Sequence, residues 1–341
     1  MATQRRLYAI PVAIQQEKLV AFTRAALQTG VSLRRATGPL GRQVAERTKT
    51  HPVQPGFAAT HLIVVDQADY FQGLDARLAA EGGTRDVGDF SHIDVDGIAR
   101  QVLISITLLS HCTWQVGGTY TFDYPDSDFP YRSGGYSHRE TVSVAQAFRY
   151  SAASGWFRDL KASELRRKCV QLDCYYRSGT WWFDRLSVAL GYLWSGLTTT
   201  HSELAFVSFC MALEAIASTS NNEITHILAE RCALLTESDL EHRLRAYSEV
   251  KDLYELRSKI VHGRSAPKKG PITSESLAIT AKLSVVPHSE LLRILAHVVA
   301  VINGVLRRPD LMALLHVKRS EEKASKALHE YFQRLLLRRE T

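Results

Sequence analysis

The chain is poor in sulfur-containing residues, with five cysteines and three methionines among 341 residues. The cysteines are odd in number and form no C-x-x-C pair, so the His138-x-Glu140 spacing lacks the partner pair of a zinc deaminase. Cys210 and Cys232 fall on apolar helical faces, where a thiol behaves as a small hydrophobe. A reducing, cytoplasmic setting without disulfides, metal or cofactor is therefore expected.

The chain also lacks two further classes of segment. No G-x-x-x-x-G-K-[ST] or G-x-G-x-x-G motif occurs, so a phosphate-cradling nucleotide site has no support. The longest apolar runs, Val102–Leu109 and the stretch near Val298–Ile302, are too short to span a bilayer. No charged-then-apolar leader opens the chain, and a membrane partner is not expected.

The chain has enough apolar residues to form the cores of two domains, and its charged residues are unevenly distributed along the sequence. Apolar residues make up 45%, and the formal net charge is +7. Residues 1–50 carry nine basic and two acidic side chains, whereas residues 51–150 carry six and twelve. This pattern suits a polyanion that touches both basic ends, or two halves of the chain that attract each other.

The first half mixes periodicities and is interrupted by glycine and proline. Thr60–Val65 and Thr113–Tyr124 are predicted as strands, and Glu17–Leu27 and Val95–Leu109 as helices. Residues 1–160 are therefore predicted to form an α+β domain, although the order of the strands cannot be determined.

Helical periodicity dominates the second half, residues 161–341. The stretch near Glu290–Leu306 is apolar nearly all round, which predicts a central position in an all-α bundle. The final helix is amphipathic and ends in basic residues. The predicted helices are Trp181–Leu197, Glu203–Ala217, Glu223–Leu235, Asp239–Val261, Glu290–Leu306 and Arg319–Leu337.

The most informative segment ends one of these helices and reads LYELRSKIVHGR. Leu253, Leu256 and Ile260 recur at helical spacing, and Gly263 stands where a helix C-terminus favours a residue tolerant of positive φ. Arg257 and His262 then lie in the last turn and a half. An arginine that holds phosphate and a histidine that moves protons can together cut RNA without metal.

The sequence around this R-x4-H motif resembles the HEPN superfamily, and most closely its Apea-like branch. Two upstream segments agree, because MALEAI at 211–216 looks like the family's "ALEAL" helix and ERCALL at 230–235 looks like its second characteristic helix. The resemblance covers about residues 179–308 and implies a HEPN-like helical bundle after the α+β domain. It also implies a sensing or regulatory role for the α+β domain, residues 1–160.

The resemblance implies a metal-independent endoribonuclease. The RNA 2′-hydroxyl would attack the neighbouring phosphate, with His262 as general acid or base and Arg257 on the scissile phosphate. Positions five apart on a helix are roughly 140° apart in rotation, so the two side chains do not stand together within one chain. Either fraying of the last turn at Gly263 or a two-fold dimer could bring both side chains to one phosphate. The resemblance implies the second, a homodimer through the HEPN helices with a composite site.

Basic residues continue past the motif, at Lys259, Arg264, Lys268 and Lys269. They are candidates for holding the RNA backbone beside the phosphate site. The alternative is a solvated connector whose lysines serve only solubility.

Four further residues are assigned supporting roles. Glu214 is a carboxylate on an apolar helix, so we expect it to pair with Arg231 or with Arg257. Ser258 shares a helical face with His262 and could orient its ring. Tyr254 could contact RNA, although a partly buried packing tyrosine is an equal alternative.

Three functions remain open from the sequence. The first is the endoribonuclease, with RNA such as tRNA as substrate, in a bacterial anti-phage defence or toxin role controlled by a phage-derived trigger or an inhibitory partner. The second is a non-catalytic RNA-binding or assembly module. The third is a helical interaction protein in which Arg257 makes a core ion pair and His262 a C-cap contact.

Overall fold

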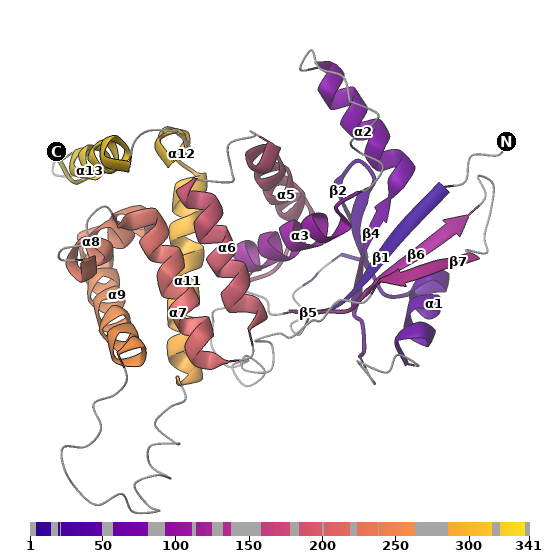
Figure 1. Ribbon diagram of the computed structural model, residues 1–341, viewed down its shortest axis with the longest axis horizontal. Helices are drawn as coiled ribbons and strands as arrows, with labels where there is room; N and C mark the ends of the chain where they lie inside the picture. Colours follow the sequence, from indigo (N-terminus) through magenta and orange to yellow (C-terminus); the bar gives the residue numbers. More distant parts are fainter. Residues whose placement is uncertain are drawn as a thin grey trace, which may run out of the picture. The chain divides into compact units, whose positions relative to one another are not determined.

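The structure is a computed structural model that describes residues 5–14, 20, 22–49, 57–80, 93–110, 114–124, 132–137, 158–177, 184–199, 201–218, 224–237, 239–262, 286–315 and 321–337. These described residues divide into two compact units between Tyr175 and Tyr176. The first unit is built on an antiparallel sheet and the second on helices alone, as Figure 1 shows. The predicted order, α+β followed by all-α, is confirmed.

The sheet of the first unit has seven strands in the order β2-β3-β4-β1-β6-β7, with β5 also paired to β1. Every pairing between these strands is antiparallel. The strands are β1 Arg5–Ile14, β2 Arg24–Gln28, β3 Val31–Arg35, β4 His61–Asp66, β5 Trp114–Val116, β6 Thr119–Tyr124 and β7 Arg132–Ser137.

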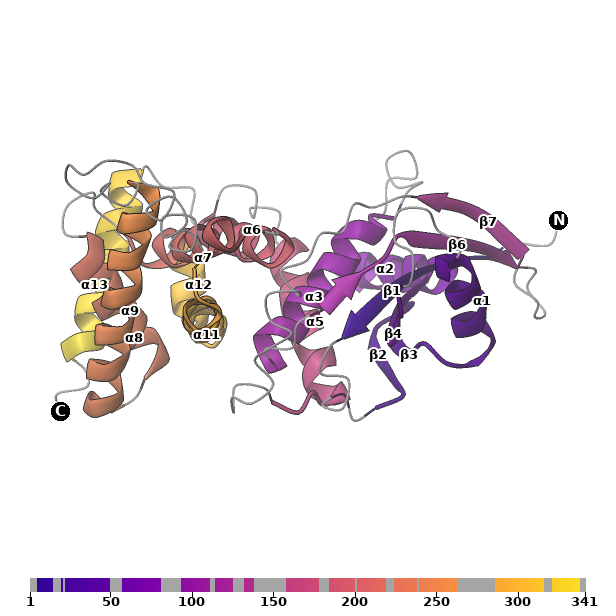
Figure 2. The same ribbon diagram turned by 90° about the horizontal axis from the view of Figure 1, so that it is seen from below.

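Helices cover both faces of this sheet because its central strands are apolar on both sides. Leu62 and Val64 of β4 join the core beneath α1 (Gly38–Lys49), while the intervening Ile63 and Val65 are buried on the other face. The helices α2 (Gln67–Ala80), α3 (Val95–Ser110) and α5 (Ala162–Arg177) complete the unit (Figure 2). Gln101 of α3 donates to the Cys169 carbonyl of α5 at 3.0 Å.

The predictions for Thr60–Val65 and Val95–Leu109 are confirmed as β4 and α3. The predicted helix Glu17–Leu27 is wrong over its second half, which is strand β2. There Ala25 and Leu27 are buried while Arg24 and Ala26 are exposed, the alternation of a half-buried strand. Gly30, with φ of 74°, closes the hairpin to β3. Residues 15–19 lie outside the described residues.

The predicted strand Thr113–Tyr124 is two strands, β5 and β6, that both pair with β1. Gly117 separates them, and its N–H donates to the Pro11 carbonyl at 2.8 Å. A Cβ at this position would lie 2.7 Å from Cγ of Pro11, so the close approach of the two chains requires glycine.

The second unit packs its helices around an apolar core. α6 and α7 approach closely because Gly196 faces Phe209, where a Cβ would lie 2.4 Å from the ring. Phe206, Leu213 and Ile216 of α7 are fully buried or nearly so. The helices are α6 Arg185–Thr198, α7 Ser202–Ala217, α8 Ile224–Thr236, α9 Leu240–Val261, α11 His288–Leu306, α12 Pro309–Leu315 and α13 Glu321–Leu337.

The helix α11 packs against α6, α7, α8, α9 and α12, which agrees with the central position expected for it. Within it, the 18-residue window Ser289–Leu306 is long and apolar enough to cross a membrane by length and composition, and 56% of it is buried inside the unit. A prediction based only on the uninterrupted apolar run near Val298–Ile302 therefore underestimates the length of the apolar segment. A central core helix has the same properties.

Candidate functional site

The C-terminal end of α7 is held by two arginines from neighbouring helices. Arg185 of α6 donates to the carbonyls of Ala215, at 3.5 Å, and of Ser218. Arg231 of α8 donates to the carbonyl of Ala217 at 2.6 Å. Helix C-termini leave carbonyls unpaired and carry a partial negative charge, so cationic donors stabilise this end. The backbone one turn upstream, at Glu214, is thereby fixed.

Arg231 is a buried structural residue rather than a partner of Glu214. Its side chain is 2% exposed, its second amino group lies 3.1 Å from Nδ1 of His329, and its guanidinium stands 4.9 Å from the Phe332 ring centre. Burial lowers the pKa of Arg231 to about 10. Of the two ion pairs expected for Glu214, the one with Arg231 is therefore not formed.

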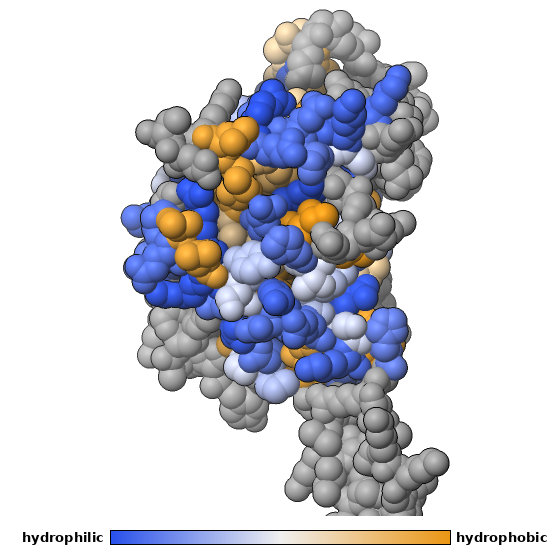
Figure 3. Space-filling view, turned by 90° about the vertical axis from the view of Figure 1, so that its left-hand side faces the viewer, coloured by the Kyte–Doolittle hydropathy of each residue, from blue (hydrophilic) through white to orange (hydrophobic). Residues whose placement is uncertain are grey.

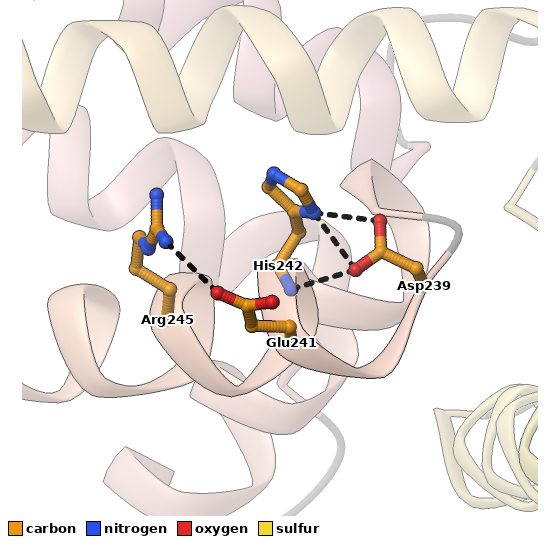
Figure 4. Close-up of polar contacts among 4 residues, drawn as sticks. All are labelled: Asp239, Glu241, His242 and Arg245. Atoms are coloured by element: carbon orange, nitrogen blue, oxygen red, sulfur yellow. Dashed lines mark hydrogen bonds and ion pairs between the residues drawn. The ribbon is translucent and has the colours of Figure 1, made fainter.

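The N-terminal end of α9 is fixed by its own cap (Figure 4). Asp239 accepts from the backbone N–H of His242 at 2.9 Å, and the His242 ring lies 2.7 Å from the same carboxylate. The pKa of Asp239 is lowered mainly by the backbone N–H of His242, and the pKa of His242 is raised by the carboxylate. One turn on, Arg245 pairs with Glu241 at 3.4 Å.

Side-chain contacts then align α9 with its neighbours. His226 of α8 lies 2.6 Å from the Tyr247 hydroxyl, and His297 of α11 lies 3.1 Å from Oε2 of Glu249. Val250 and Leu253, which follow these contacts along α9, are buried. The length of α9 is therefore anchored before it reaches the R-x4-H segment.

At the other end of α9, two side chains of this helix meet on Glu214 of α7. The Tyr254 hydroxyl donates to Oε1 of Glu214 at 2.8 Å, and Nη2 of Arg257 lies 3.4 Å from the same oxygen. The Arg257 guanidinium also stands 5.5 Å from the Tyr254 ring centre. The Glu214–Arg257 pair anticipated as one alternative is thus present, and Tyr254 is a buried packing residue that also binds the carboxylate.

The cluster is only partly shielded from solvent. The side chains of Arg257 and Glu214 are 22% and 24% exposed. Burial, together with the bond to Glu214, raises the pKa of Tyr254 above its ordinary range, so the phenol remains a donor. Among the described residues, Nε of Arg257 is buried and has no hydrogen-bond partner. The guanidinium therefore keeps donor capacity beyond its ion pair.

His262 follows as the C-terminal cap of α9. Its backbone N–H donates to the Ser258 carbonyl at 3.1 Å, and its side chain is exposed, as are Ser258 and Lys259. The contact between Ser258 and His262 is therefore a backbone one. Gly263 and the candidate RNA-binding residues Arg264, Lys268 and Lys269 lie outside the described residues.

The surface around this end of the unit is polar. Figure 3 views the helical unit from the side of α8, α9 and α13 and shows separate hydrophobic groups among hydrophilic ones. Exposed large apolar residues of this unit include Leu240 and Leu244 on α9 and Leu337 on α13. Within the part of the chain that the structure describes, no group of three His, Cys, Asp or Glu could hold a metal.

Two residues of the site environment were not assigned to the candidate site from the sequence. Arg185 follows the Asp184 cap of α6, and its role depends on where α7 ends. Cys210 lies one helical turn before Glu214, and burial with the nearby carboxylate raises its thiol pKa. The i, i+4 spacing of Cys210 and Glu214 was the available signal.

Comparison with known proteins adds no relative. The chain matches no protein family, and neither the curated proteins nor the solved structures give a significant match. The arguments for function therefore come from this chain's own residues.

Proposed function

We propose that the protein is a metal-independent endoribonuclease whose site is built on Arg257 and His262. The observation that carries the proposal is the end of α9, where a semi-exposed guanidinium held on Glu214 is followed by an exposed imidazole at the helix terminus. The resemblance of this segment's sequence to HEPN proteins supports the same assignment.

Each residue has a defined task in this proposal. Arg257 would bind a non-bridging oxygen of the scissile phosphate and stabilise the charge that develops there. His262 would take the proton of the 2′-hydroxyl or give one to the leaving 5′-oxygen. The products would be a 2′,3′-cyclic phosphate and a 5′-hydroxyl. DNA lacks the attacking hydroxyl and would stay intact.

Glu214 and Tyr254 would act as positioning residues. The carboxylate fixes the guanidinium, and the phenol fixes the carboxylate, so that Arg257 loses little freedom when phosphate arrives. The neighbouring Lys259 is exposed and adds positive charge for the RNA backbone.

The helical geometry favours a site shared between two copies of the chain. Arg257 and His262 are separated by roughly 140° of helical rotation, so one phosphate would be reached by the arginine of one subunit and the histidine of its partner. The proposal therefore includes a homodimer through the helical unit.

A rival function is supported by one observation. Arg257 does form an ion pair and His262 does cap α9, as a purely helical interaction protein would require. Under that alternative the arginine serves the fold alone. An RNA-binding module without turnover is the remaining alternative, and it would retain RNA affinity without cleavage.

The deciding experiment is cleavage of total tRNA and of a fluorescent RNA oligomer in EDTA by the wild-type protein, His262→Ala and Arg257→Ala. Cleavage by the wild type alone, with cyclic-phosphate ends, is the expected result. A folded wild-type dimer that binds RNA without cutting it, in the presence of cellular extract as a source of activator, would overturn the assignment.

A mixing experiment tests the shared site. Each of Arg257→Ala and His262→Ala is inactive alone, but a mixed dimer retains one site with both intact side chains. Subunit exchange should then restore about a quarter of the wild-type activity. If the mixture stays inactive while mass spectrometry shows mixed dimers, the two residues act within one chain.

A further inference from the structure

A groove in the first unit is unrelated to the candidate site and lies between strand β2 and helix α5. Its volume is about 600 Å³. One wall is formed by Arg24, Ala25 and Ala26 of β2, and the other by the face of α5 that carries Ser163, Arg166, Arg167 and Val170. In the sheet as described, β2 is an edge strand, because it pairs only with β3.

The hydrogen-bond pattern shows which backbone groups face away from the sheet. The Arg35 N–H donates to the Thr23 carbonyl at 2.8 Å, and Ala25 lies opposite Leu33. Bonded pairs alternate along antiparallel strands, so Arg24 and Ala26 direct their N–H and C=O groups away from β3. Arg24 and Ala26 both line the groove, and no described strand pairs with their outward backbone groups.

The groove is also strongly basic. Arg24, Arg166 and Arg167 all line it, all are exposed, and none has an ion-pair partner among the described residues. Among the described residues that line the groove, none is acidic. Val170 of α5 is 41% exposed and adds an apolar contact in the same groove.

We propose that this groove binds an extended acidic peptide segment of a partner protein, added as a new strand to β2. The outward backbone groups of Arg24 and Ala26 would pair with the peptide backbone. The three guanidinium groups would bind its carboxylates. Nucleic acid is the poorer fit, because the described residues that line the groove include no aromatic ring on which bases could stack.

The test uses the full-length protein and a fluorescein-labelled decapeptide of alternating glutamate and threonine, with fluorescence anisotropy at fixed salt. Charge reversal in Arg166→Glu/Arg167→Glu should weaken binding by at least about tenfold. Ala26→Pro should weaken it as well, because proline removes an outward N–H while edge strands tolerate it. Amide exchange at Ala26 should slow when the peptide is bound.

Arg42→Glu provides the matched control, since Arg42 is exposed on α1 away from the groove lining. Its peptide affinity should equal that of the wild type, and melting curves must show that every variant is folded. Strand addition is overturned if Ala26→Pro binds normally, or if a decauridylate RNA binds more tightly than the peptide with the same dependence on the arginines. Absence of peptide binding to the wild type overturns it too.

Discussion

Arg257 of α9 and Glu214 of α7 are joined by an ion pair of 3.4 Å at the surface of the helical unit. The two residues are 43 positions apart in the sequence, and each is supported by further contacts. Arg185 and Arg231 fix the end of α7, and Tyr254 holds the carboxylate. The pair therefore connects the framework of the bundle to the residue proposed to bind phosphate.

Two arginines of this region should respond differently to substitution. Arg257→Ala removes a partly exposed ion pair and is expected to cost about 1 kcal/mol of unfolding free energy while abolishing RNA cleavage. Arg231→Ala removes a buried, charged hydrogen-bond donor to the end of α7 and is expected to lower the free energy of unfolding by about 3 kcal/mol. Urea unfolding measures both. A globally unfolded Arg257→Ala protein would favour the purely structural role of that arginine.

Tyr254→Phe isolates the positioning role of the phenol. The substitution removes the hydrogen bond to the Glu214 carboxylate and keeps the ring contact with Arg257. The free energy of unfolding is expected to fall by about 1.5 kcal/mol. Cleavage should fall less than in Arg257→Ala, because the phosphate-binding group remains. Activity as low as that of Arg257→Ala would instead indicate direct contact between Tyr254 and RNA.

The cap of α9 should be most stabilising at mildly acid pH. The pKa of Asp239 is lowered from 3.8, so its contribution is present above that value and is lost as pH falls through the lowered pKa. The pKa of His242 is raised from 6.5, so its contribution is complete below 6.5 and is lost as pH rises through the raised pKa. Thermal melts of His242→Gln and the wild type should differ most between these limits and converge at alkaline pH.

His297 should have the opposite pH dependence. Burial lowers its pKa from 6.5, and the nearby Glu249 opposes this only in part. The neutral ring is favoured in the folded protein, so stability is complete above 6.5 and declines as pH falls below it. His297→Gln should flatten that decline in a pH series of urea unfolding curves. An unchanged decline would mean that other groups cause the acid sensitivity.

Thiol labelling should distinguish the described cysteines. Burial raises the pKa of Cys169 and Cys232 to about 12 and shifts that of Cys210 in the same direction, whereas Cys174 is exposed. In a Cys112→Ser background, iodoacetamide should modify Cys174 in the native protein and the other three only after denaturation. Peptide mass spectrometry reads out each site, and rapid native labelling of Cys210 would contradict the packing beside Glu214.

The sequence by itself was sufficient for the division into an α+β part and a helical part, because hydrophobic periodicity is a local property. The helices α7 and α9 carry uninterrupted 3.6-residue patterns over many turns, and both were predicted within a residue or two. Strand β2 was mistaken for a helix because its five residues, RAALQ, include good helix formers. Pairing with β3 overrides that preference, and no local pattern reports such pairing.

The local sequence motif was enough to find the residues of the candidate site, but it did not determine which residues they contact. Glu214 had two arginine partners open to it in the sequence, and only helix packing decided that Arg257 takes the role while Arg231 caps α7. The basic groove beside β2 has the same origin. Arg24 and Arg166 are 142 positions apart, and only the tertiary structure brings a sheet edge and a helix face together, because burial of the apolar faces fixes which polar groups become neighbours.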